Sequence, residues 1–305
     1  MKKSLLLLCL LPFLFSYITI KAQQKSIYDE GLKQYHDKQY DNAIKSFTKV
    51  ILDNPNTTEA WYNRGLSYYA LKNYGKAIDD FTMVLSRNSD DKDALNYRGF
   101  CYQENQKYEM AITDYSKLLS LSPELVNVIY NRGICRYNQK KYYEAIEDFI
   151  KVIEKSPKDK DAWVFKGLCY YALLNDEKAI ECYDAAIKIS ATDYLSFYNR
   201  GLAYYDLKNY NLALTDFIKT TELNPNHAKS YFYIGYIYYG KEEFSLALEK
   251  YNKAIALNPK YDMAYYYRGF AYRKMGKTQQ GCDDWKKARD LGYKEAIKTI
   301  ADYCN

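Results

Sequence analysis

Apolar residues recur along the chain at intervals of three and four, the spacing that places side chains on one face of an α-helix. Two such stripes follow each other in the middle of the chain, formed by Tyr130, Ile134 and Tyr137 and then by Ala145, Phe149 and Val152. Residues 138–141 separate the stripes, and Pro157 stops the second helix because proline lacks the backbone donor that a helix interior needs. The pattern predicts two helices joined by a short turn.

The same pattern returns every 34 residues, and a glycine marks each return. The glycines are Gly31, Gly65, Gly99, Gly133, Gly167, Gly201, Gly235 and Gly269. Twelve residues after each glycine comes a small residue, which is Gly281 in the last repeat and alanine in the others, and an aromatic residue follows four positions later. A glycine inside a helix costs about 1 kcal/mol relative to alanine. We therefore expect these small residues to mark the close contact between the two helices of a pair.

This period resembles that of the tetratricopeptide repeat (TPR) family. Trp61, Gly65, Tyr68, Ala77 and Phe81 match its consensus of Trp, Gly, Tyr, Ala and Phe. The resemblance implies an all-α fold, a right-handed α-solenoid in which the first helix of each repeat (helix A) lines the concave side and the second (helix B) packs behind it. The solenoid is expected over residues 24–295, as eight repeats at 24–57, 58–91, 92–125, 126–159, 160–193, 194–227, 228–261 and 262–295. A further helix over residues 293–304 is expected to cap the last hydrophobic face.

An arginine replaces the consensus leucine before the glycine in five repeats, and sixteen residues later each of these repeats carries an aspartate. The pairs are Arg64 and Asp80, Arg98 and Asp114, Arg132 and Asp148, Arg200 and Asp216, and Arg268 and Asp284. The other three repeats lack both residues. Because the two residues are present or absent together, we expect structural ion pairs between helices A and B, which specify register more than they add stability. An arginine ladder for anionic ligands is the alternative.

Tyrosine is in large excess, with 37 residues, and many tyrosines fall on the ligand-binding face that the resemblance implies for helix A. If the recurring glycine is position 8 of a repeat, positions 5 and 12 would line a groove. The candidate groove residues are Tyr62, Tyr69, Tyr130, Tyr137, Tyr171, Tyr198, Tyr205, Phe232, Tyr239 and Tyr266. Tyrosine suits a binding surface because it combines a large contact area with a hydroxyl. Packing between repeats is the alternative role. Position 9 is apolar or aromatic, which disfavours the Asn-based clamp for chaperone tails that some family members carry.

The N-terminal segment differs from the repeats. Lys2 and Lys3 precede an apolar run at residues 5–20, which is shorter than the roughly 20 residues of a membrane span. This pattern predicts a signal peptide at residues 1–22, cleaved after Ala22, with an uncleaved membrane anchor as the alternative. We expect an exported protein of the bacterial periplasm or cell envelope, without a transmembrane span in the mature chain.

An exported protein can keep disulfide bonds. We expect Cys282 and Cys304 to pair, because the last helix would fold back along the preceding one. Cys169 and Cys182 are weaker candidates, placed symmetrically about the turn at residues 175–176. Cys101 and Cys135 share with Cys169 a small core position in successive repeats, a spacing that is not typical of a metal site.

The sequence contains no catalytic motif, phosphate-binding loop or histidine cluster, so we expect no catalytic residue, metal or cofactor. The formal net charge is +6, or about +3 without the lysines of the signal peptide, which is too weak to favour nucleic acid. The sequence favours a non-catalytic scaffold that binds a peptide or protein partner of unknown identity. The alternative is a glycan-binding module for cell-wall or surface polysaccharide, and an enzyme is the third hypothesis.

Overall fold

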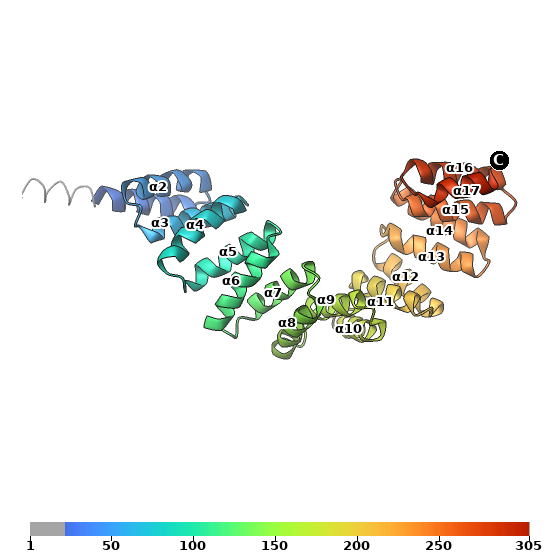
Figure 1. Cartoon of the computed structure of the whole chain (residues 1–305), viewed down its shortest axis with the longest axis horizontal. Coiled ribbons are helices and arrows are strands. Elements are labelled where there is room, and N and C mark those ends of the chain that lie inside the picture. Colours follow the sequence, from blue (N-terminus) through green and yellow to red (C-terminus); the bar gives the residue numbers. More distant parts are fainter. Residues whose placement is uncertain (1–21, 305) are drawn as a thin grey trace, which may run out of the picture. The chain divides into compact units, whose positions relative to one another are not determined.

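The computed structural model describes residues 22–304, and all regular elements in this range are helices joined by short turns (Figure 1). The signal peptide expected at residues 1–22 lies outside the described residues except for Ala22. The described chain forms two compact units, which meet in the sequence between Lys155 and Ser156. Each is a row of helix pairs, so the all-α repeat fold expected from the sequence is confirmed.

The first unit begins with helical residues 22–36. Its other helices are α2 (Tyr40–Asp53), α3 (Thr58–Ala70), α4 (Tyr74–Arg87), α5 (Lys92–Glu104), α6 (Tyr108–Leu121), α7 (Val126–Asn138) and α8 (Tyr142–Lys155). The second unit contains α9 (Lys160–Ala172), α10 (Asp176–Ile189), α11 (Tyr194–Asp206), α12 (Tyr210–Leu223), α13 (Ala228–Gly240), α14 (Phe244–Leu257), α15 (Asp262–Lys274), α16 (Thr278–Asp290) and α17 (Glu295–Tyr303). In both units the odd-numbered helices from α3 to α15 are A helices and the even-numbered ones are B helices.

The recurring glycines lie where helix A meets the aromatic ring of helix B. A Cβ atom on Gly167 would lie 2.6 Å from Cε1 of Tyr183, a distance too short for any side chain. In the eighth repeat the ring is Trp285, and a Cβ on Gly281 would lie 2.8 Å from the carbonyl oxygen of Gly269. The glycine that replaces alanine at position 281 is therefore explained by the close approach of two helix backbones.

The turn between helices A and B uses a left-handed residue in every repeat. The residues with positive φ are Lys38, Lys72, Gln106, Lys140, Leu174, Lys208, Glu242 and Gly276. Only the last of these is a glycine, although L-residues with a Cβ atom are disfavoured in this conformation. Leu174 is the most exposed large hydrophobic side chain of the described residues, at 87%, so its side chain contributes little packing to offset that cost.

Leu174→Gly is expected to raise the free energy of unfolding by about 1 kcal/mol, because glycine adopts a positive φ without the Cβ penalty. Leu52→Gly is the matched control, since Leu52 is also largely exposed but lies in the last turn of α2 without a positive φ, so glycine should bring no gain in stability there. Urea unfolding followed by circular dichroism measures both. A loss of stability in both variants would contradict the role assigned to the turn.

The C-terminal helix covers the end of the second unit. This helix, α17, buries Ala296 and Thr299. The ring of its last residue, Tyr303, lies 5.7 Å from that of the fully buried Trp285. A capping helix was expected at residues 293–304, and α17 lies within that range. It shields the indole of the last B helix from solvent.

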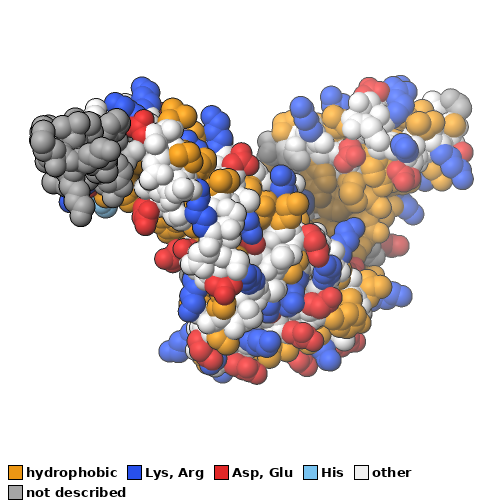
Figure 2. Space-filling view, turned by 60° about the vertical axis from the view of Figure 1, so that its left-hand side comes forward, with side chains coloured by type: hydrophobic (Ala, Val, Ile, Leu, Met, Phe, Trp, Pro, Cys, Tyr) orange, Lys and Arg blue, Asp and Glu red, His pale blue; other side chains and the backbone are white. Residues whose placement is uncertain are grey.

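The surface carries both charge signs. On the face drawn in Figure 2, basic and acidic side chains are mixed, and hydrophobic side chains, tyrosine included, form patches among them. None of the helices within residues 22–304 has both the length and the hydropathy required to cross a membrane.

Candidate functional site

Five arginines connect helices A and B as expected. Each donates from Nε and Nη2 to the two carboxylate oxygens of its aspartate, at nitrogen–oxygen distances of 2.6–3.1 Å. The aspartates are all buried. This bidentate geometry orients both side chains and so fixes how the two helices of a repeat face each other.

The same arginines also bridge consecutive repeats, a contact that was not predicted from the sequence. In each, Nη1 donates to a polar side chain on helix B of the preceding repeat. The acceptors are Thr48, Thr82, Ser116, Asp184 and Asn252. Each lies sixteen residues before its arginine, and the equivalent positions before Lys166 and Ile234 are Ile150 and Ile218. The spacing of sixteen residues could therefore have predicted this contact, but the acceptors are of four different residue types, so the pattern is hard to recognise in the sequence.

Aromatic rings lie near the guanidinium groups of four of these arginines, Arg64, Arg98, Arg200 and Arg268. The Cζ atom of Arg64 lies 4.8 Å from the ring centre of Trp61 and 6.0 Å from that of Tyr68. Burial lowers the pKa of Arg64, but its hydrogen bonds and the charge of Asp80 raise it more, so the net shift is upward. Because all three guanidinium nitrogens of each arginine already bond to side chains of the fold, these arginines favour the structural role over an arginine ladder for anionic ligands.

Nine of the ten candidate groove residues have partly exposed side chains, and these nine are the tyrosines. Phe232 was also expected in the groove, but this prediction is wrong: its ring is only 2% exposed. It lies in the core, 5.2 Å from the ring of Tyr261 and 5.7 Å from that of Tyr267. Without a hydroxyl to hydrate, Phe232 is buried by the tyrosines that surround it.

The tyrosines at positions 5 and 12 also pack between repeats. Tyr69 lies 5.3 Å from the ring of Tyr97 and 5.5 Å from that of Phe100, both in the next repeat. Tyr205 has the same relation to Tyr233 and Tyr236, at 5.4 and 5.8 Å. One side of these rings therefore supports the neighbouring A helix, and the remaining partly exposed surface is available to a ligand.

Some of the candidate tyrosines also contact polar groups or a histidine ring. The hydroxyl of Tyr171 donates to a carboxylate oxygen of Asp206 at 2.7 Å, and the ring of Tyr198 lies 4.6 Å from that of His227. Tyr266 differs because no repeat follows it. Its hydroxyl lies 3.0 Å from that of Thr299 on α17, so the capping helix covers this end of the tyrosine row.

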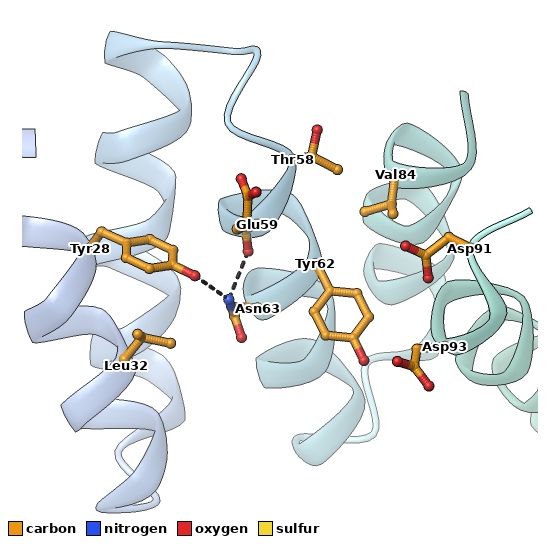
Figure 3. A pocket seen from close by; sticks show the side chains of 9 residues that line it. All are labelled: Tyr28, Leu32, Thr58, Glu59, Tyr62, Asn63, Val84, Asp91 and Asp93. Carbon is orange, nitrogen blue, oxygen red and sulfur yellow. Dashed lines mark hydrogen bonds between the residues drawn. The ribbon is translucent and has the colours of Figure 1, made fainter. Parts of the chain in front are cut away.

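A pocket opens beside Tyr62 in the first unit, and the repeat pattern did not predict it. Its volume is about 440 Å³, and its lining residues are Tyr28, Leu32, Thr58, Glu59, Tyr62, Asn63, Val84, Asp91 and Asp93 (Figure 3). Burial raises the pKa of the Tyr62 hydroxyl above its usual range, and the charges of Asp93 and Asp91 add to the shift. The pocket thus combines two tyrosine rings with three carboxylates.

Cys282 and Cys304 form a disulfide with a Cα–Cα distance of 5.7 Å, as the sequence suggested. The weaker pair is wrong, because Cys169 and Cys182 are both free and buried. Cys182 occupies the position of the paired aspartate, and Lys166 occupies that of the arginine. Burial raises the pKa of Cys182 to about 11, although the charge of Lys166 lowers it.

The remaining free cysteines have little reactivity. Burial raises the pKa of Cys101 and of Cys135 to about 12, so both stay as thiols at neutral pH. Residues 22–304 also contain no group of three histidine, cysteine, aspartate or glutamate side chains able to hold a metal ion.

Comparison with known proteins agrees with this geometry. Tetratricopeptide repeat models match residues 58–91, 92–125, 126–159, 194–227 and 263–291, and a TPR repeat model matches 167–208 and 235–276. A search of curated proteins found no match.

Solved structures of repeat proteins are similar in fold. The C-terminal part of a TPR repeat-containing protein from Cytophaga hutchinsonii has 23% identity and a TM-score of 0.65, over 78% of this chain and 98% of that one. A tetratricopeptide repeat protein from Parabacteroides merdae has 19% identity and a TM-score of 0.58, over 84% and 98%. YrrB, described as a TPR protein with an unusual peptide-binding site, has 23% identity and a TM-score of 0.53, over 63% and 99%. At these identities the likeness concerns the fold, and since the matched repeat models cover more than half of the sequence, the chain belongs to the tetratricopeptide repeat family.

Proposed function

We propose that this protein is a non-catalytic interaction scaffold of the bacterial cell envelope, which binds a peptide or protein partner on the tyrosine-lined face of its A helices. The observation that carries the proposal is that nine tyrosines at positions 5 and 12, four in the first unit and five in the second, have partly exposed side chains. A ring fixed on one side by the next repeat loses little freedom on binding, which favours affinity. The peptide-binding site named for YrrB supports the same use of this fold.

The envelope location rests on the expected signal peptide, and the Cys282–Cys304 disulfide supports it. Structural disulfides persist in oxidising compartments and are rare in the cytosol.

A polypeptide partner fits this face better than a glycan. The rings meet edge to face, with interplanar angles of 72° for Tyr69 and Tyr97 and 70° for Tyr205 and Tyr236. Rings inclined to one another in this way form no continuous flat platform for a stacked sugar. Such groups suit the mixed polar and apolar surface of a peptide.

Affinity capture from a solubilised envelope fraction tests the proposal, with the chain from Gln23 onwards as bait. The binding variant replaces Tyr69, Tyr137, Tyr205 and Tyr239, all at position 12, with alanine. The control is Tyr143→Ala on helix α8, whose side chain is 71% exposed. We expect a defined protein to be captured by the wild type and the control, and its affinity for the binding variant to fall at least about tenfold.

The alternatives give different results. Equal capture by all three baits would place the binding surface elsewhere and contradict the proposal. Binding of soluble polysaccharide fragments that the four alanines abolish would replace it with the glycan-binding function. Circular dichroism and thermal unfolding of each bait establish that a lost interaction does not result from a lost fold.

A further inference from the structure

We infer that the pocket beside Tyr62, the acidic pocket, binds a lysine or arginine side chain of the partner polypeptide. This inference rests on the proposed function and adds a chemical specificity to it. The acidic pocket is defined by its nine lining residues, from Tyr28 to Asp93, which come from the first three repeats. All of them belong to the first compact unit.

The shape of the acidic pocket suits a long side chain with a charged end. Figure 3 shows the ring of Tyr62 between Glu59 and Asn63 on one side and Asp91 and Asp93 on the other, with its hydroxyl directed toward Asp93. Leu32 and Val84 supply apolar lining. The methylene groups of a lysine or arginine can lie against such a wall while the charged end reaches the carboxylates.

The charge of the acidic pocket is not neutralised from within. None of its nine lining residues is basic. Among residues 22–304, no ion pair is formed by Glu59, Asp91 or Asp93. Lys92 lies between the two aspartates in the sequence, but its side chain is exposed and does not line the pocket. Glu59 and Asp93 are exposed and Asp91 is partly exposed, so a ligand can reach all three carboxylates from solvent.

Helix termini explain part of this arrangement. Asp91 accepts a hydrogen bond from the backbone N–H of Ala94 and so caps α5, while Asp93 and Glu59 lie in the first turns of α5 and α3. Acidic residues at such positions are favoured by the helix dipole. The dipole accounts for each acidic residue separately, but together Glu59, Asp91 and Asp93 surround the Tyr62 ring with negative charge, which a cationic side chain would neutralise.

The pocket walls are held in place before any ligand arrives. Asn63 donates from Nδ2 to the hydroxyl of Tyr28 at 2.9 Å and to the carbonyl oxygen of Glu59 at 2.8 Å. These bonds connect the first helix to α3. A tyrosine ring beside a cation adds a favourable electrostatic contact. A metal ion is a poor occupant, since no three acidic, histidine or cysteine side chains in the described chain lie close enough together to hold one.

Selection from a random dodecapeptide phage library tests the inference on the chain from Gln23 onwards. The pocket variant is Glu59→Gln/Asp93→Asn, which removes two charges without a large change of shape and leaves the cap at Asp91 intact. The control is Glu147→Gln/Glu154→Gln, which removes two charges from exposed positions on α8 of the same unit.

We expect the wild type and the control to select peptides with a lysine or arginine at one shared position. A selected peptide should bind the pocket variant about tenfold more weakly, as two lost ion pairs imply. Replacing its basic residue with norleucine should cause the same loss in the wild type and no further loss in the pocket variant.

The two proposals fail differently. If peptides are selected that depend on the position-12 tyrosines but share no basic residue, or bind the pocket variant as well as the wild type, the acidic pocket does not have this role and the scaffold function stands. If the four position-12 alanines leave the affinity of every selected peptide unchanged, the proposed function fails as well.

Discussion

Asp148→Ala is expected to lower the free energy of unfolding by about 3–5 kcal/mol. The carboxylate of Asp148 is 0% exposed, and it accepts hydrogen bonds from Arg132 at 3.1 and 2.7 Å and from Arg136 at 2.7 Å. Its loss would leave two largely buried guanidinium groups facing each other without an anion. Urea unfolding followed by circular dichroism measures the change.

Asp184→Ala is the matched control for this prediction. Asp184 also bonds an arginine, Arg200, but its side chain is 50% exposed. Water can replace it there, so the variant should lose less than about 1 kcal/mol. Losses of equal size in the two variants would contradict the prediction, because they would show that burial does not determine how much these ion pairs contribute to stability.

Cys304→Ser is expected to cost roughly 3 kcal/mol, because the disulfide to Cys282 closes a loop with a sequence separation of 22 residues. The loss should be largest at the C-terminal end, where α17 covers Trp285. Thermal unfolding with and without reductant measures it. Reductant should lower the unfolding midpoint of the wild type to that of Cys304→Ser, and it should leave the midpoint of Cys304→Ser unchanged.

Cys169→Ala serves as the control for the reductant effect. Since Cys169 is a free, buried thiol, this variant should keep the full response of the wild type to reductant. An unchanged midpoint for the reduced wild type would contradict the stabilising role of the disulfide. A response that disappears in Cys169→Ala would contradict the assignment of the free cysteines.

The helix pairs and the arginine pairs could be predicted because each repeats within one chain. A residue that appears in five repeats together with a partner, and is missing together with it in three, provides the comparison that one isolated pair lacks. The sequence showed that Gly281 departs from the alanine pattern, but it did not show why. The close approach of the two backbones at Gly269 depends on how the indole of Trp285 packs, which spacing alone does not determine.

The candidate groove was predicted less well, because the position within a repeat does not specify the neighbours of a side chain. Phe232 has the same repeat position as Tyr198, yet it is buried by the rings around it. Tyr266 is only partly exposed, because α17 stands where another repeat would begin and contacts its hydroxyl. The acidic pocket left no signal, since acidic residues such as Glu59 and Asp93 are ordinary in the first turn of a helix.

The most direct test of the binding claim is hydroxyl-radical footprinting of the wild-type chain with its captured partner. We predict reduced oxidation of the partly exposed tyrosines on the A helices, above all Tyr69, Tyr137, Tyr205 and Tyr239, with Tyr143 on α8 unchanged. Reduced oxidation of Tyr143, with the A-helix tyrosines unchanged, would contradict the claim and place the partner on the B helices.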